Sequence, residues 1–154
     1  RTHKIDFPAN VEVIGQYAFS EAQLNTIVLP PVLERIEKRA FEKAYIGDLQ
    51  FASGSHLETI GEAAFQAKNY SGEGTLQLPL GLKEIGDNAF FFDKANWLSA
   101  ISIPSSVTTI GDDICDRSSI YLDVESGSYA YLWATENGYM VLNNGEDDTD
   151  WLNN

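Results

Sequence analysis

The residues best able to do chemistry in this sequence are two histidines and a single cysteine. His3 and His56 each lack a histidine or cysteine partner at the spacing that zinc sites use. The sequence likewise offers no basis for a serine–histidine–aspartate arrangement around either histidine. His56 stands between Ser55 and an apolar Leu57 in a segment rich in small polar residues, so we interpret it as a solvated loop residue.

Cys115 is the only cysteine in the chain. No disulfide can therefore form within the chain, and no thiolate cluster can hold zinc. Cys115 stands where related segments of the sequence place phenylalanine, which favours a role as a small buried apolar residue. The alternative is a reactive thiol, which would need an exposed and electropositive setting.

Several acidic and glycine-containing motifs are also incomplete as sites. Gly72-Glu73-Gly74 lacks the third glycine and the strand–helix context of a phosphate-binding loop. The acidic run at 146–150 lacks the glycine and the closing glutamate of a calcium loop. Asn69-Tyr70-Ser71 matches a glycosylation acceptor, which matters only in a eukaryotic secretory route. We therefore predict no catalytic residue, no metal site and no cofactor, and we expect a non-enzymatic protein.

Composition and charge narrow the class of partner. The 154 residues carry a net charge of −13, and 44% are hydrophobic, which is typical of a folded protein. A phosphate backbone needs clustered Lys and Arg, so nucleic acid is excluded as a partner. The acidity is explained by solubility, or alternatively by attraction of basic partners or cations. No apolar run approaches the roughly 20 residues that span a bilayer. The start at Arg1, almost inside a repeat, suggests a processed chain or a piece of a longer protein.

The elements that would position any site come from an internal repeat. Ile85-Gly86-Asp87-Asn88-Ala89-Phe90 has near-copies that begin at Ile14, Ile36, Ile60 and Ile110. The leading isoleucines are spaced by 22, 24, 25 and 25 residues. Such a period is typical of a solenoid, whose units bury their apolar faces against one another.

A short strand precedes each copy of the repeat. In each strand two apolar residues flank one outward residue, which predicts a sheet with one buried and one solvated side. Proline closes four of the five strands. The strands are centred on Ile5-Asp6-Phe7, Ile27-Val28-Leu29, Leu49-Gln50-Phe51, Leu76-Gln77-Leu78 and Ile101-Ser102-Ile103.

A second apolar residue lies three positions before each repeat isoleucine, as Leu82 does before Ile85. This spacing predicts a tight or helical turn on the side opposite the sheet. We expect the repeat glycine to supply a positive φ, although Glu37 replaces it in the second unit. The phenylalanine of each copy is expected to fill the core.

Two later segments depart from the repeat. Phe91, Phe92 and Trp97 lie in a longer connection, where they either cover the core or form an exposed contact patch. From residue 120 onward we predict a capping unit: a strand at 120–122, a helix at 129–137 ended by Gly138, and a strand at 139–142. We assign 1–142 to one solenoid of about five repeats plus this cap, and 143–154 to an acidic tail.

The repeated pattern Val-x-x-Ile-Gly-x-x-Ala-Phe after a strand and proline resembles the BspA-like leucine-rich repeats of bacterial surface proteins. Residues 101–112 fit closely, and Ser126 to Ala130 with Glu136 to Tyr139 resemble the family's C-terminal unit. The family often has cysteine three residues after the phenylalanine, whereas this chain has Ala22, Ala44, Lys68 and Asp93.

The resemblance implies an α/β leucine-rich-repeat solenoid: a short horseshoe with a parallel sheet on its concave side, short helical or irregular turns on its convex side, and a C-terminal cap. It also implies secretion or cell-surface display, often in Bacteroidetes, with roles in adhesion and protein binding. It supplies no catalytic residues.

The candidate binding residues are the outward positions of the predicted sheet, which should form a column spaced about 4.8 Å per strand. The column is either a contact surface for a protein, such as a host extracellular protein or another surface macromolecule, or simply solvated. A structural spacer in a larger surface protein is the alternative function, and an enzyme on a solenoid scaffold is the third. We expect a monomer. The column comprises Asp6, Val28, Gln50, Gln77, Ser102 and Tyr121, flanked by Lys4, Thr26, Asp48, Thr75 and Ser119.

Overall fold

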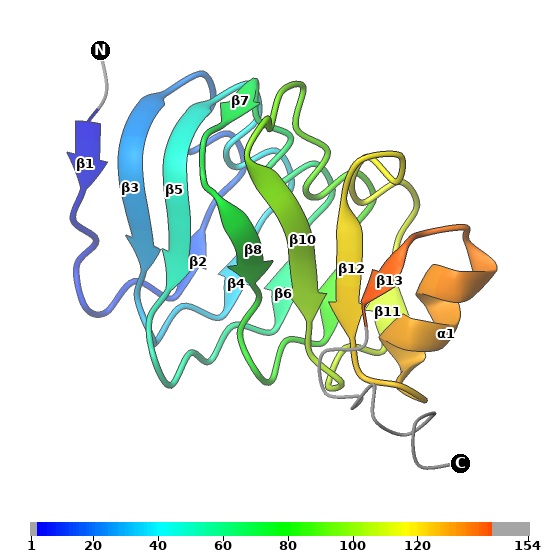
Figure 1. Cartoon of the computed structure of the whole chain (residues 1–154). Helices are drawn as coiled ribbons and strands as arrows, with labels where there is room; N and C mark the ends of the chain where they lie inside the picture. Colours follow the sequence, from blue (N-terminus) through cyan, green and yellow to red (C-terminus); the bar gives the residue numbers. More distant parts are fainter. Residues whose placement is uncertain (1–2, 143–154) are drawn as a thin grey trace, which may run out of the picture.

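The chain folds as a solenoid of parallel strands, and the computed structural model describes residues 3–142 (Figure 1). One side, which we call the long-strand face, carries two four-stranded sheets with the orders β1-β3-β5-β7 and β8-β10-β12-β13. The predicted strands are confirmed on this face, except that the first one ends at Ile5, before its predicted centre at Asp6. Its strands are β1 (His3–Ile5), β3 (Gln23–Leu29), β5 (Tyr45–Phe51), β7 (Asn69–Tyr70), β8 (Gly74–Gln77), β10 (Leu98–Ile103), β12 (Tyr121–Val124) and β13 (Val141–Leu142).

The opposite side carries a second parallel sheet, which the sequence did not lead us to expect. The tight turn lies earlier in each unit than predicted, where the N–H of Leu82 donates to the carbonyl of Pro79. The repeat isoleucines then pair from coil to coil, and the N–H of Gly86 donates to the Ile60 carbonyl over 2.8 Å. This sheet consists of two-residue strands: β2 (Val13–Ile14), β4 (Arg35–Ile36), β6 (Thr59–Ile60), β9 (Glu84–Ile85) and β11 (Thr109–Ile110).

The repeat glycine does not have a positive φ, so that prediction is wrong. The left-handed residue is two positions later, as in Asn88 with φ 57°. The glycine is needed because successive coils approach closely there. A Cβ at Gly86 would lie 2.5 Å from the backbone nitrogen of Glu62, and one at Gly61 would lie 2.8 Å from that of Lys38. Such approach of backbone to backbone leaves no room for a side chain.

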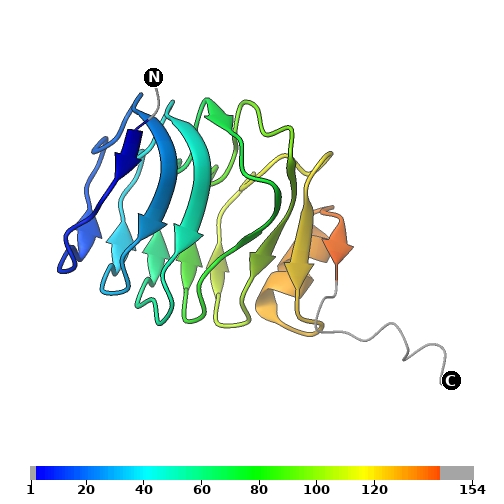
Figure 2. The same cartoon turned by 60° about the vertical axis from the view of Figure 1, so that its left-hand side comes forward.

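The repeat phenylalanines form a continuous column through the core, as predicted. Phe41 and Phe65 stack with ring centroids 4.9 Å apart, and Phe65 and Phe90 stack at 5.4 Å. All three rings are fully buried. Phe19 extends the column at 5.1 Å from Phe41 but is itself only partly buried in the first coil. The column explains why the coils stack in a regular series (Figure 2).

The predicted capping unit is also present. Helix α1 (Tyr129–Glu136) begins at Ser128, whose Oγ accepts the N–H of Tyr131 over 3.1 Å. It ends before Gly138, which has φ 78°. Arg117 ties the cap to the last coil, because its guanidinium bonds to Asp113 and to the Asn137 carbonyl. The predicted acidic tail at 143–154 lies outside the described residues. Within 3–142, no helix is long and apolar enough to cross a bilayer.

Candidate binding surface

Strand register brings most of the predicted column together on the long-strand face. Val28 on β3 stands beside Gln50 on β5, and Gln77 on β8 stands beside Ser102 on β10. The pairing of Ile5 with Ile27 carries Asp6 next to Val28. Ser102 is half-buried and the other four are exposed. The long-strand face carries the parallel strands that the family resemblance assigned to the concave side of a horseshoe.

Tyr121 does not belong to this column, and Asp123 takes its place. β12 pairs with β10 so that Asp123 is level with Ser102, whereas Tyr121 is level with Ala100. Ser119 does not flank the column either, because β12 begins at Tyr121 and Ser119 precedes it. Asp123 is only 7% exposed, so the column ends there in a buried carboxylate instead of an aromatic ring.

Other flanking residues are placed as expected. Thr26 pairs with Asp48 across β3 and β5, and Thr75 pairs with Ala100 across β8 and β10. The side chain of Lys4 is outside the described part of the structure.

The column is interrupted between β5 and β8, which the sequence did not indicate. β5 pairs with β7 only at Tyr45 and Ile46, and β8 pairs with β10. Within the described 3–142 segment, no ladder joins β5 to β8. The cause is the longer connection between these coils. After the N–H of Ser71 donates to the Ile46 carbonyl, the chain leaves β5 and resumes as β8 at Gly74 (Figure 1).

The interruption forms a groove, which we call the β5–β8 groove. Its upper part, beside Tyr70 and Glu73, has a volume of about 410 Å³, and its lower part has a volume of about 620 Å³. The two parts adjoin, because both have Phe51 and Gln77 in their walls. The upper part is lined by Asp48, Leu49, Gln50, Phe51, Tyr70, Glu73, Thr75 and Gln77, and the lower part by residues 51–55 and 77–80.

Tyr70 closes the amino end of the groove. Its ring stacks on Phe92 at 4.8 Å, and its hydroxyl donates to Oδ1 of Asp48 over 3.3 Å. Gly72 is required beside it, since a Cβ there would lie 2.2 Å from the Tyr70 hydroxyl. Burial, followed by the nearby Asp48 carboxylate, raises the pKa of Tyr70. The phenol is therefore neutral and acts as a hydrogen-bond donor that fixes Asp48.

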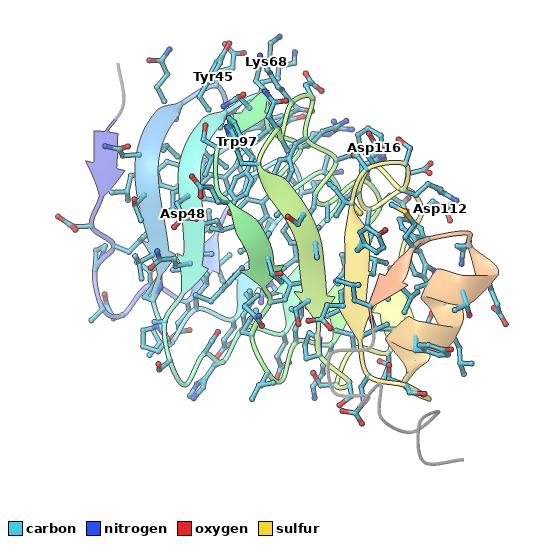
Figure 3. The ribbon with its side chains drawn as sticks, viewed as in Figure 1. Tyr45, Asp48, Lys68, Trp97, Asp112 and Asp116 are labelled. Atoms are coloured by element: carbon cyan, nitrogen blue, oxygen red, sulfur yellow. The ribbon has the colours of Figure 1, made fainter. Side chains whose placement is uncertain are left out.

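The groove is acidic. Asp48 and Glu73 line its upper part, and no Lys, Arg or His belongs to the lining that the structure describes. The second carboxylate oxygen of Asp48 accepts Nε2 of Gln50 over 2.8 Å. Asp48 is thus held from two sides and presents a fixed negative charge on the front of β5 (Figure 3).

Exposed apolar side chains border the column and the groove. Val28 is 42% exposed and Tyr45 and Tyr121 are similarly open on the same face. The sequence allowed the aromatic residues of segment 91–97 either to cover the core or to form an exposed contact patch, and the structure shows one residue of each kind. Phe92 is buried in the core, but Trp97 is 63% exposed, and its carbonyl accepts the N–H of Gly74 at the amino end of β8.

The other reactive or ionisable side chains considered above are either exposed to solvent or have a structural role. His56 is exposed. Cys115 is buried, and burial raises the pKa of its thiol to about 12, which agrees with a filling role. Asp112 donates its N–H to Oδ1 of Asp87 in the preceding coil over 2.7 Å. In the part of the chain that the structure covers, no group of three or more His, Cys, Asp or Glu could hold a metal ion.

Sequence reasoning missed the groove although two signals pointed toward it. The connection after Phe65 is longer than those before it, and Ser53-Gly54 is inserted after β5. Both changes fall at the junction where pairing is lost. Glu73 and Tyr70 were therefore not among the candidate residues, and Asp48 was named only as a flanking position.

Comparison with known proteins agrees with this architecture. A family model described as a BspA type leucine rich repeat region matches the chain in six copies across residues 1–121. The crystal structure of the pneumococcal vaccine antigen PcpA is similar, with a TM-score of 0.52 and 25% sequence identity. The match covers 76% of this chain but only 36% of that one, so this chain spans little more than a third of the antigen's length. No curated protein matches.

Proposed function

Because the chain belongs to the BspA-type leucine-rich-repeat family, we propose that it is a non-enzymatic protein-binding module of a secreted or cell-surface bacterial protein. It binds or adheres through the long-strand face, with the longer connections contributing at the edge. The partner is a protein, such as a host extracellular protein. The similarity to a vaccine antigen supports a surface setting, and an origin in the Bacteroidetes stays a prediction of the family resemblance.

The observation that carries this proposal is the character of the long-strand face. Half-exposed Val28, Tyr45 and Tyr121 stand there among short polar side chains. These three residues lie on three strands and at different levels, so each is a separate apolar contact point on a mostly polar face, and aromatic residues are enriched in protein interfaces. Parallel strands also hold these side chains at a fixed spacing, so that little ordering is needed on binding.

A matched pair of valine substitutions tests the proposal. Val28 lies on the long-strand face and is 42% exposed, whereas Val13 lies on the opposite sheet and is 37% exposed. Val28→Arg places a bulky charge in the column on β3, and Val13→Arg places the same charge on the opposite sheet. Binding of each variant and of the unmodified chain is measured against an array of purified host extracellular and plasma proteins.

We expect Val28→Arg to lower affinity for the bound protein at least tenfold and Val13→Arg to leave it unchanged. Equal binding by both variants would contradict a contact through the long-strand face. A chain that binds nothing on the array or on intact host cells would instead favour the structural spacer. Thermal unfolding of both variants checks that the fold is intact.

A further inference from the structure

We propose that the β5–β8 groove binds an extended basic peptide segment of the partner protein, with a Lys or Arg side chain held between Asp48 and Glu73. This inference deepens the proposed function and rests on it. It specifies which part of the long-strand face recognises the partner, and it assigns that recognition to carboxylates that bind a basic side chain.

The groove offers backbone groups on both walls. The N–H of Ala52 donates to Leu29 and that of Leu78 donates to Ser102, away from the groove in both cases. Successive residues of a strand direct their backbone groups to opposite sides, so Phe51 and Gln77 direct theirs into the groove. No ladder links these walls within residues 3–142. β5 and β8 come within 8 Å of one another in places, which is too close for a strand to insert between them, so the peptide lies over the groove and reaches these backbone groups from the solvent side.

The charge of the groove selects a cationic side chain. Asp48 and Glu73 are the charged residues among its described lining. Asp48 is fixed by the Tyr70 hydroxyl at one oxygen and by Gln50 at the other. A carboxylate that is already oriented loses little freedom when it accepts a charge-assisted hydrogen bond. The net charge of −13 adds long-range attraction for a basic segment.

The lower end of the groove selects an apolar side chain. It is walled by Phe51, Leu78 and Pro79, and Leu80 beside it is 83% exposed. An isolated leucine with this exposure gains from contact with an apolar partner. A peptide along β8 therefore places its basic residue near Glu73 and an apolar residue near Leu80. An extended chain advances about 3.3 Å per residue and keeps alternate side chains on one face, so the two residues are an even number of positions apart.

Other ligand classes fit the groove less well. A divalent cation would need more oxygen ligands than Asp48 and Glu73 supply, and no larger acidic group is formed within the described residues. An acidic peptide would meet like charge. These classes are outcomes of the test described next.

The test is a selection from a random dodecapeptide phage library on the immobilised full chain. Enriched peptides are synthesised, and their affinity is measured by fluorescence anisotropy for the unmodified chain, Asp48→Asn, Glu73→Gln and Glu84→Gln. Glu84 is an exposed glutamate on β9 of the opposite sheet and is the matched control. Leu80→Ser removes the apolar side chain at the lower end without disturbing the core.

We expect the enriched peptides to share a Lys or Arg and an apolar residue at even separation. Their affinity should fall at least tenfold in Asp48→Asn and Glu73→Gln, severalfold in Leu80→Ser and not at all in Glu84→Gln. Their binding should also weaken as salt is raised from about 50 to 300 mM, because charge pairs at a surface are screened.

Enriched peptides without a basic residue, or with equal affinity for Asp48→Asn and Glu84→Gln, would overturn the inference. So would failure to enrich any peptide, or binding only of glycans or divalent cations in parallel assays. These failures are distinguishable from failure of the proposed function. A whole protein whose binding depends on Val28 but not on Asp48 would leave the long-strand face as the contact surface and remove the groove from it.

Discussion

Replacing one repeat glycine with alanine should test how closely the coils are stacked. A Cβ at Gly86 would lie 2.5 Å from the nitrogen of Glu62 and 2.7 Å from the carbonyl carbon of Gly61. These neighbours are backbone atoms, so relief requires the third and fourth coils to move apart. That movement would stretch the 2.8 Å hydrogen bond from the Gly86 N–H to the Ile60 carbonyl.

The expected loss of stability follows from these contacts. Forcing a methyl group into a packed interior costs roughly 1–3 kcal/mol. Weakening one backbone hydrogen bond costs about 0.5–1.5 kcal/mol more. The alanine also restricts the unfolded chain, which offsets roughly 0.4–1 kcal/mol of the loss. The free energy of unfolding should therefore fall by roughly 0.5–4 kcal/mol in Gly86→Ala, with a central value of about 2 kcal/mol.

Gly15→Ala is the matched control, because within residues 3–142 no coil packs against the same repeat position in the first coil. A Cβ at Gly15 meets nothing within 4 Å. Only the effect on the unfolded chain remains, so we expect Gly15→Ala to gain about 0.4–1 kcal/mol. The two substitutions are chemically identical and should differ in sign.

The measurement is urea unfolding at 25 °C, followed by circular dichroism and by intrinsic fluorescence. Coincidence of the two signals is needed because repeat proteins can unfold in parts. If Gly86→Ala were as stable as Gly15→Ala, the close approach of coils would not be the reason for the glycine. That result would also leave the recurrence of glycine after the repeat isoleucine unexplained.

Three further outcomes are expected. Phe65→Ala should cost about 3–5 kcal/mol because its fully buried ring stacks on two others, whereas Gln77→Ala should change stability by less than about 0.5 kcal/mol in the same urea assay. Stability should fall as pH rises from 9 toward 12, because burial raises the pKa of Cys115 from its ordinary 9.0 to about 12 and only the unfolded thiol ionises at the lower value; burial raises the pKa of Tyr70 and of Tyr139 as well, so Cys115→Ala should reduce this decline without removing it in unfolding curves taken across that range. Ser128→Ala should lower the free energy of unfolding by about 1 kcal/mol, because it removes the hydrogen bond from the Tyr131 N–H to the Ser128 hydroxyl. An unchanged melting temperature would argue against a stabilising role for this helix-capping bond.

The repeat unit was predictable from sequence because its signals are redundant. Each phenylalanine is accompanied by an isoleucine, a small residue and a strand at nearly constant spacing. An error in one unit is therefore corrected by the others, and the buried column from Phe41 to Phe90 follows. The cap helix was predicted from the spacing of Tyr129, Leu132 and Trp133 and from Gly138 after its end, and α1 forms there. The predicted apolar face is wrong, because Tyr129 and Leu132 are exposed and α1 packs through the buried Ala130 and Ala134.

Strand register in the last unit was not predictable from alternation. Ile120 and Leu122 flank Tyr121, and Leu122 and Val124 flank Asp123 with the same apolar pattern. A shift of two residues keeps the same side chains buried, so alternation gives no reason to prefer either. Pairing with β10 decides the matter and makes Asp123 the partner of Ser102. The function of the repeat glycine was missed similarly, because close approach of two coils leaves no local signal.

The groove follows from a conflict between the two sides of the solenoid. On the opposite sheet β6 and β9 pair through Ile60 and Ile85, which holds the third and fourth coils together. On the long-strand face the longer connection carries Tyr70 into the place where pairing with β5 would continue. The extra residues are therefore absorbed on one side only. The sheet of two-residue strands and the phenylalanine column preserve the stack, which leaves the long-strand face free to open and to differ from coil to coil. A solenoid built this way can vary its contact surface without losing the packing that holds it, and that separation is the physical reason to look for binding at the β5–β8 groove.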